Sequence, residues 1–171
     1  NSIIGFTGTL LEGYAGPLLP EQRKQMGMVN DSARHLLSLI NDILDISRIE
    51  AQQMAIERQL FPLRETIAGV AGIITPLAER KGLVLITDVA DDVGMVVGDQ
   101  RRVRQVLMNL LGNAVKFTPH GSIKVSAMRR QATGAEVVIV DVEDTGVGIS
   151  PEDLPHLFEP FRQARTGSPA S

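Results

Sequence analysis

Hydrophobic positions recur at helical spacing through the first fifty residues of the chain. The segment 1–11 carries five apolar residues in this pattern and ends at a stretch rich in glycine and proline, 12–17. Pro20 opens a longer pattern that runs to Glu50 without an interrupting proline. We predict a short helix followed by a helix of about 45 Å. The apolar positions of the long helix are Met26, Val29, Ala33, Leu36, Leu37, Ile40, Ile43, Leu44 and Ile46.

This apolar stripe is too wide for one hairpin to bury. Two hairpins bury such a stripe when they pair as a four-helix bundle. We therefore expect a homodimer, with the stripe from Met26 to Ile46 at its interface.

The remaining chain alternates between strand and helix patterns. We expect a helix from Pro62 to about Arg80 and another over 101–115, which Asp99 would cap. The expected strands are 54–60, 83–86, 95–97, 121–130 and 136–142. The predicted fold class is α+β: a helical hairpin, then an α/β sandwich with one mixed sheet covered by helices on one face.

Composition excludes several classes of protein. Hydrophobic residues make up 43% of the chain and charged residues 22%, the net charge is −3, and there is no cysteine. No block of basic residues suggests nucleic-acid binding, and no apolar run has the length of a membrane span. The chain begins in mid-pattern without Met, so we expect a cytosolic piece of a longer protein, the alternative being the cytosolic part of a membrane-anchored sensor.

The first candidate for chemistry follows a strand. The β-branched run from Val137 to Val142 predicts a buried strand, and Asp144 comes just after it. Gly146 and Gly148 then allow positive φ and close approach to the backbone. A carboxylate here is able to accept hydrogen bonds from an exocyclic amino group such as that of adenine. An ordinary strand-to-loop turn fits the same pattern equally well.

The second candidate lies on the helix over 101–115. Asn109 and Asn113 are four residues apart and share a helix face, and Lys116 follows near the same end. Side-chain carbonyl oxygens suit Mg²⁺ when phosphates complete its coordination. The alternative is that both asparagines face solvent and Lys116 interacts with the helix dipole.

Three motifs in order carry a resemblance. The segments 109–118 (NLLGNAVKFT), 144–149 (DTGVGI) and 157–161 (LFEPF) resemble the asparagine box, the first glycine box and the phenylalanine box of sensor histidine kinases of two-component systems. The resemblance implies the Bergerat-type (GHKL) ATP-binding fold, which gyrase, a heat-shock chaperone family and mismatch-repair ATPases share.

The resemblance also implies residue roles. Asp144 would bind adenine, Asn113 would ligate Mg²⁺, Asn109 would support the metal and phosphates, and Lys116 would face the phosphates. The glycines would shape the pocket floor and the start of a lid, which two phenylalanines would anchor. The expected ATP-binding residues are Asn109, Asn113, Lys116, Asp144, Gly146, Gly148, Ile149, Phe158 and Phe161.

The hairpin carries a resemblance of its own. Residues 1–6 (NSIIGF) resemble the sequence that follows the phosphoacceptor box of these kinases, and residues 41–51 resemble the end of their second helix. In the family the phosphorylated histidine precedes this point, and none of His35, His120 and His156 fits its place. We therefore expect no catalytic residue in this chain and no autophosphorylation at the family site. A second glycine box is also not found after 161.

The function implied is that of a histidine kinase core. Residues 1–52 would form the dimerisation and phosphotransfer hairpin, and 53–171 the ATP-binding catalytic domain. The parent protein would transfer the γ-phosphoryl of ATP to a histidine and then to an aspartate of a response regulator receiver domain. The alternatives are an ATPase of the same fold and a non-catalytic dimeric docking module. The long hairpin directly before the ATP domain favours the kinase.

Overall fold

The computed structural model describes residues 1–51, 53–132 and 134–157. The chain divides into two compact units, residues 1–55 and residues 56–171. None of the helices within the described ranges combines the length and the apolar character that a membrane crossing requires.

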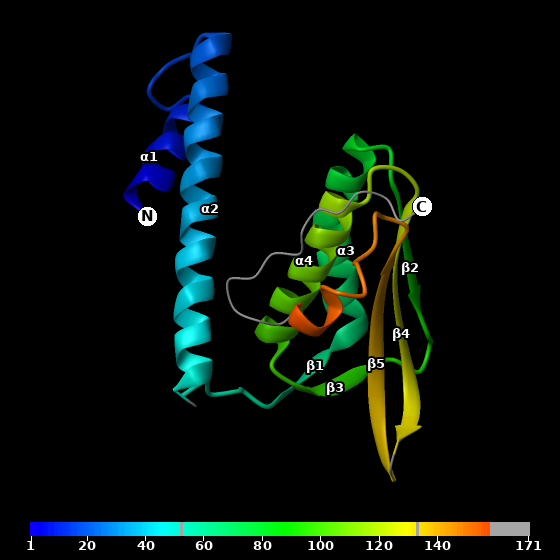
Figure 1. Cartoon of the computed structure of the whole chain (residues 1–171). Coiled ribbons are helices and arrows are strands. Elements are labelled where there is room, and N and C mark those ends of the chain that lie inside the picture. The colour runs from blue at the N-terminus through cyan, green and yellow to red at the C-terminus, as the bar shows by residue number, and fades with distance from the viewer. Residues whose placement is uncertain (52, 133, 158–171) are drawn as a thin grey trace. The chain divides into compact units, whose positions relative to one another are not determined.

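The first unit is the expected helical hairpin. Helix α1 spans Ser2–Leu11 and helix α2 spans Pro20–Glu50, as Figure 1 shows. Pro20 occupies the first turn of α2, and the Gln22 side chain accepts a hydrogen bond from the Leu19 amide at 3.0 Å. Arg23 donates to the carbonyl of Leu11 at 2.8 Å, so the loop between the helices is tied at both ends.

A buried polar contact joins the two helices. Asn30 and Thr7 are 6% and 7% exposed, and the Asn30 amide nitrogen donates to Thr7 Oγ1 at 2.6 Å and to the Ile4 carbonyl at 3.2 Å. Arg34 Nε donates to Asn30 Oδ1 at 2.7 Å. Because buried polar groups are costly without partners, this contact favours one register of α1 against α2.

The strands of the second unit form two sheets within the described residues. Strands β1 (Gln59–Pro62) and β3 (Met95–Gly98) pair antiparallel. Strand β4 (Ser122–Ala132) lies between β2 (Val84–Val89), to which it is parallel, and β5 (Ala135–Asp144), to which it is antiparallel. The predicted mixed sheet is confirmed, since β4 has one parallel and one antiparallel neighbour. The β1–β3 pair forms a second sheet, which the expectation of a single sheet did not include.

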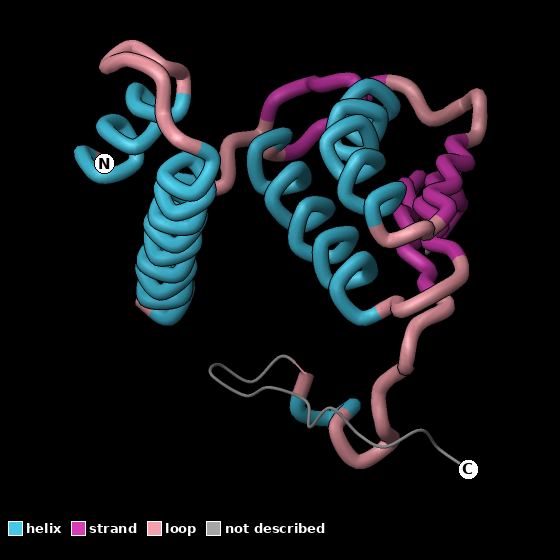
Figure 2. Tube along the Cα trace, turned by 90° about the horizontal axis from the view of Figure 1, so that it is seen from above, coloured by secondary structure: helices cyan, strands magenta, loops and turns pink. Residues whose placement is uncertain are grey.

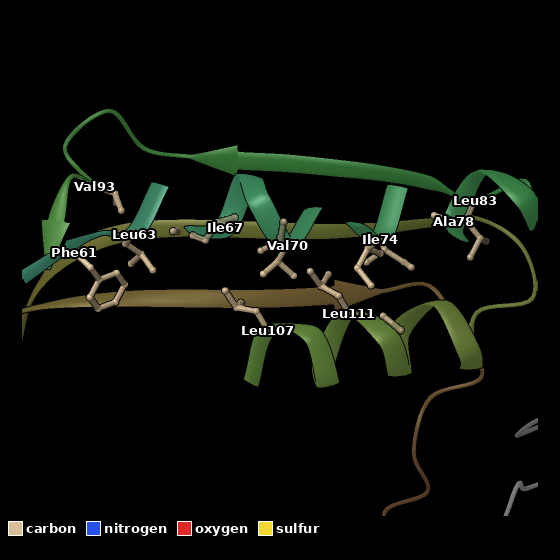
Figure 3. Close-up of a cluster of buried hydrophobic side chains, with 14 residues drawn as sticks. Phe61, Leu63, Ile67, Val70, Ile74, Ala78, Leu83, Val93, Leu107 and Leu111 are labelled. Carbon is tan, nitrogen blue, oxygen red and sulfur yellow. The ribbon is translucent and has the colours of Figure 1, made fainter. Parts of the chain in front are cut away.

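Two helices cover one face of the three-stranded sheet. Helices α3 (Leu63–Arg80) and α4 (Gln100–Phe117) lie side by side there, as seen from above in Figure 2. Figure 3 shows Leu107 and Leu111 of α4 pointing toward Val70 and Ile74 of α3. The buried hydrophobic core comprises Phe61, Leu63, Ile67, Val70, Ile74, Ala78, Leu83, Val93, Leu107, Leu111, Ala114, Ile123, Val125 and Ala127.

Two local expectations were wrong. The first strand was expected over 54–60, but β1 begins at Gln59. The run 137–142 was expected to be buried, yet its residues in β5 are half-buried or exposed, since Val138, Val140 and Val142 pack against the core while the residues between them lie on the other face of the sheet. β-branched residues favour strands whether or not both faces are covered.

Candidate functional site

Helix α4 is fixed at its beginning by Asp99. The carboxylate accepts a hydrogen bond from the Arg102 amide at 3.1 Å, which confirms the predicted N-cap. Its other oxygen accepts from the Glu57 amide at 3.3 Å. These backbone hydrogen bonds, with that from Arg102 the largest cause, lower the pKa of Asp99 below its ordinary value.

The face of α4 that points away from the hydrophobic core carries the predicted polar residues. Leu107, Leu111 and Ala114 are buried, whereas Asn109 and Asn113 are exposed. The same exposed side includes the apolar residues Val106, Leu110 and Phe117. A helix face that mixes carboxamides with aliphatic and aromatic surface offers contacts to both the polar and the flat parts of a nucleotide.

Lys116 is exposed at the last turn of α4. Its Nζ atom lies 5.0 Å from the centroid of the Phe117 ring, within the range of a cation–π contact. The ammonium group is therefore next to the same helix end as the two asparagines, as the sequence predicted.

Asp144 lies at the end of β5, next to the C-terminal end of α4. Its Oδ1 atom accepts hydrogen bonds from the Gly146 amide at 2.8 Å and from Thr118 Oγ1 at 3.4 Å, the latter a long contact. Thr118 is fully buried, whereas Asp144 is exposed and not buried as its place after a β-branched run suggested. These contacts give the carboxylate a fixed orientation while leaving it accessible to a ligand.

Gly146 holds the loop after β5 against α4. A Cβ atom at this position would lie 2.6 Å from both Asp144 Oδ1 and the Phe117 carbonyl oxygen. The next amide, that of Val147, donates to the Phe117 carbonyl at 3.3 Å. Gly148 follows with φ +69°, a conformation that favours glycine. The structure thus brings the Asp144–Gly148 segment together with the end of the asparagine helix.

Sequence reasoning missed Thr145 and Thr118 as supports of this loop. Thr145 is bonded to Ser122 at the start of β4 in two ways. The Ser122 amide donates to Thr145 Oγ1 at 3.0 Å, and the Thr145 amide donates to the Ser122 carbonyl. Thr145 also packs against Gly121, whose φ is +116°. Thr118 belongs to the motif 109–118 and Thr145 to the motif 144–149. Membership of these motifs was the sequence signal that could have identified them.

The segment after the loop is partly described. Ile149 is exposed, and Ser150 Oγ accepts from the Asp153 amide at 3.2 Å before a short 3₁₀ helix, η1 (Leu154–His156). Phe158 and Phe161 lie outside the described residues. Within the described ranges, no group of three or more His, Cys, Asp or Glu side chains is placed to hold a metal ion.

Comparisons with known proteins agree with these motifs. The model of the family described as histidine kinase-, DNA gyrase B-, and HSP90-like ATPase matches residues 98–170. The model of the His kinase A (phospho-acceptor) domain matches residues 1–52. The signal transduction histidine-protein kinase BarA of Escherichia coli (strain K12) is 40% identical over 166 residues, which is 96% of this chain and 18% of BarA.

This chain therefore carries the His kinase A domain over residues 1–52 and the histidine kinase-like ATPase domain over residues 98–170, the domain pair of a sensor histidine kinase core. It is also 45% identical over 150 residues to the sensory/regulatory protein RpfC of Xanthomonas campestris pv. campestris, covering 86% of this chain and 21% of RpfC. The chain therefore spans about a fifth of the length of the curated relatives that it matches.

Solved histidine kinases share the fold. Full-length ShkA, crystallised in complex with AMPPNP, is similar with a TM-score of 0.66 and 33% identity, over 89% of this chain and 32% of that chain. The Acinetobacter baumannii histidine kinase AdeS is similar with a TM-score of 0.66 and 25% identity, over 93% of this chain and 75% of that chain.

Proposed function

We propose that this chain is the ATP-binding and dimerisation core of a sensor kinase, whose parent protein transfers the γ-phosphoryl of ATP to a histidine and then to an aspartate of a response regulator. Residues 1–52 would form the dimerisation and phosphotransfer hairpin, and residues 53–171 the catalytic domain. The observation that carries the proposal is the position of Asp144, a fixed but accessible carboxylate next to the end of the asparagine helix.

Asp144 is suited to recognise adenine. Among the described residues, its Oδ1 atom takes the protein's own hydrogen bonds, from Gly146 and Thr118, while the carboxylate stays exposed. An ionised carboxylate only accepts hydrogen bonds, so it selects a base with an exocyclic amino donor at that place. Gly146 lets the loop approach the Phe117 carbonyl closely, and the space beside Gly148 is open, so this loop would not obstruct such a base. Ile149 extends the apolar surface next to these glycines, and Phe158 and Phe161 would contribute to the lid.

The phosphates and their metal would be held by α4. Carboxamide oxygens of Asn113 and Asn109 are hard ligands, and Mg²⁺ keeps several waters and uses the phosphates of its nucleotide as further ligands. This donor set, without a cluster of carboxylates in the described part of the chain, fits an ion that arrives with ATP. When bound, the metal supplies charge neutralisation on the phosphates. Lys116 would contribute a second positive charge at the same helix end.

Catalysis by such a site consists of positioning and electrostatic stabilisation. Phosphoryl transfer demands little covalent chemistry from the protein, so the residues above would bind and orient ATP while the acceptor histidine approaches the γ-phosphate. The AMPPNP complex of ShkA supports nucleotide binding in a relative of this fold. The proposed partners are a second copy of this chain and a response regulator receiver domain.

A second reading is an ATPase of the same fold or a non-catalytic docking module. The hairpin favours the kinase, because the His kinase A match covers residues 1–52 immediately before the nucleotide-binding unit.

Titration calorimetry with AMPPNP and Mg²⁺ tests the proposal. Asp144→Ala removes the adenine acceptor and should weaken binding at least about tenfold, the scale of 1.4 kcal/mol. Asp141→Ala is the matched control, because Asp141 is an exposed aspartate of the same strand three residues earlier. Equal affinities for the wild type and Asp144→Ala would remove Asp144 from the site.

A further inference from the structure

Lys81 stands at the junction between α3 and β2, in a turn with a fixed backbone. The Leu83 amide donates to the Ala78 carbonyl at 3.0 Å, and the Gly82 amide donates to the Glu79 carbonyl at 2.9 Å. Gly82 has φ +71°, and Leu83 is 4% exposed in the core. This pattern ends α3 and anchors the chain on both sides of Lys81.

The Lys81 side chain reaches the other helix. Its ammonium nitrogen donates to the carbonyl of Val115 at 2.7 Å and to the carbonyl of Lys116 at 3.0 Å. The last carbonyls of a helix have no partner within the helix, and the C-terminal end carries partial negative charge. Lys81 therefore supplies both the missing donors and a favourable charge to the end of α4.

The neighbouring carbonyls of α4 have other donors. Ala114 accepts from the Thr118 amide at 3.0 Å, and Phe117 accepts from the Val147 amide at 3.3 Å. The end of α4 is thus held by its own continuing chain, by the ammonium group of Lys81, and by the loop that follows β5.

This helix end bears on the candidate nucleotide site. The hydroxyl of Thr118, the residue after α4, donates a hydrogen bond to Asp144. The Phe117 carbonyl accepts a hydrogen bond from the Val147 amide, in the loop that Asp144 begins. A change in the backbone at Val115 or Lys116 would pass directly through Phe117 and Thr118 to the carboxylate. Lys81 itself is exposed and stands two contacts away from Asp144.

We propose that Lys81 is a positioning residue for the nucleotide site, whose ammonium group fixes the end of α4 and thereby the orientation of Asp144. This inference rests on the proposed function, because it assigns Lys81 to the same site. Water can replace the ammonium at the exposed carbonyls, so its loss should leave the fold intact while it loosens the helix end. We expect Lys81→Met to weaken AMPPNP binding about tenfold, the scale of one charge-assisted hydrogen bond.

The test compares four variants with the wild type by calorimetry with AMPPNP and, separately, with adenosine. These are Lys81→Met, Lys81→Arg, Asp144→Ala and the double variant Lys81→Met with Asp144→Ala. Lys124→Met is the matched control, since Lys124 pairs with Asp88 at 2.8 Å on the sheet and not with α4. Circular dichroism establishes that each variant is folded at the temperature of the titration.

The proposal expects four results. Lys81→Met should weaken adenosine and AMPPNP by similar factors, because it acts through the base contact. Lys81→Arg should restore most of the affinity, and Lys124→Met should bind as the wild type does. In the double-mutant cycle, Lys81→Met should add little to Asp144→Ala, since the two changes act on one contact.

Three outcomes would overturn the inference, and the last of them is distinguishable from the first two. If the wild type binds AMPPNP and Lys81→Met binds equally well, or if its loss is fully additive with that of Asp144→Ala, Lys81 does not position the site and the proposed function stands. If the wild type binds neither ligand, the proposed function fails, and the role of Lys81 fails with it.

Discussion

Gly146 lies so close to Phe117 that a methyl group on its Cα atom would be 2.6 Å from the Phe117 carbonyl oxygen. The contact joins the loop after β5 to the last turn of α4, and backbone on both sides leaves little room to yield. The same methyl group would meet Asp144 Oδ1 at 2.6 Å. The first prediction follows from this contact.

Gly146→Ala should destabilise the chain and weaken nucleotide binding together. Overpacking of this kind costs about 1–3 kcal/mol, and the loop would relieve it by moving Asp144. Thermal unfolding and AMPPNP titration measure the two effects. Gly69→Ala is the control, because a Cβ there meets nothing within 4 Å and its position inside α3 favours alanine. Unchanged affinity in Gly146→Ala would show that the loop does not depend on this close approach.

Asp99→Asn should reduce stability near neutral pH and flatten its dependence on pH. The folded pKa of Asp99 lies below the ordinary value of 3.8, so its contribution is present above that value and is lost as the pH falls through the lowered folded pKa. Denaturant unfolding of the wild type and the variant over a series of acidic pH values measures the difference. Glu79→Gln, an exposed position of α3, is the control. A constant difference between the two curves at every pH would contradict this assignment.

Asn30→Ala should destabilise the hairpin by about 1–3 kcal/mol, because it removes the buried donor from which Thr7 Oγ1 and the Ile4 carbonyl accept hydrogen bonds. Thermal unfolding at fixed protein concentration measures the loss, and Asn41→Ala, an exposed asparagine of α2, is the control. The double variant Thr7→Val with Asn30→Leu should recover part of the stability, since it removes both polar groups. If the double variant is no more stable than Asn30→Ala, polar groups left without partners are not the cause of the lost stability.

Ile43→Asp should shift the chain from dimer to monomer. Ile40, Ile43 and Leu44 are 46%, 49% and 50% exposed in the single chain, an apolar stripe that a second copy would cover. Light scattering over a range of concentrations measures the association. Asn41→Asp introduces the same charge at an exposed polar position two residues away, where the helix presents a different side. A wild type that remains monomeric at high concentration would refute the dimer.

The helices were predictable from sequence because their apolar periodicity coincides with their buried faces. In α4 the buried residues Leu107, Leu111 and Ala114 follow the helical repeat, and Asp99 carries a clear N-cap signal. The start of β1 was not predictable, because the Glu57 amide bonds to the distant Asp99 carboxylate and not to a neighbouring strand. The separation of the two sheets likewise depends on pairings between residues far apart in sequence.

The candidate site was likewise predictable from sequence only in part. Asp144 and the asparagines were singled out from sequence because three motifs in order resemble one family, whereas each motif alone fits an ordinary loop or helix. The exposure of Asp144 was missed, since a β-branched run predicts a strand but not which of its neighbours are present. Lys81 carries no local signal at all, because its role depends on the packing of α3 beside α4.

The cap that Lys81 forms has a consequence for biosynthesis. The residues that it joins are 34 and 35 positions apart, and Val147, whose amide completes the cap, comes still later in the chain. A chain emerging from the ribosome therefore completes α3 well before the end of α4 acquires its donors. Ligand affinity in this unit should therefore appear only after α3 and α4 are already in place.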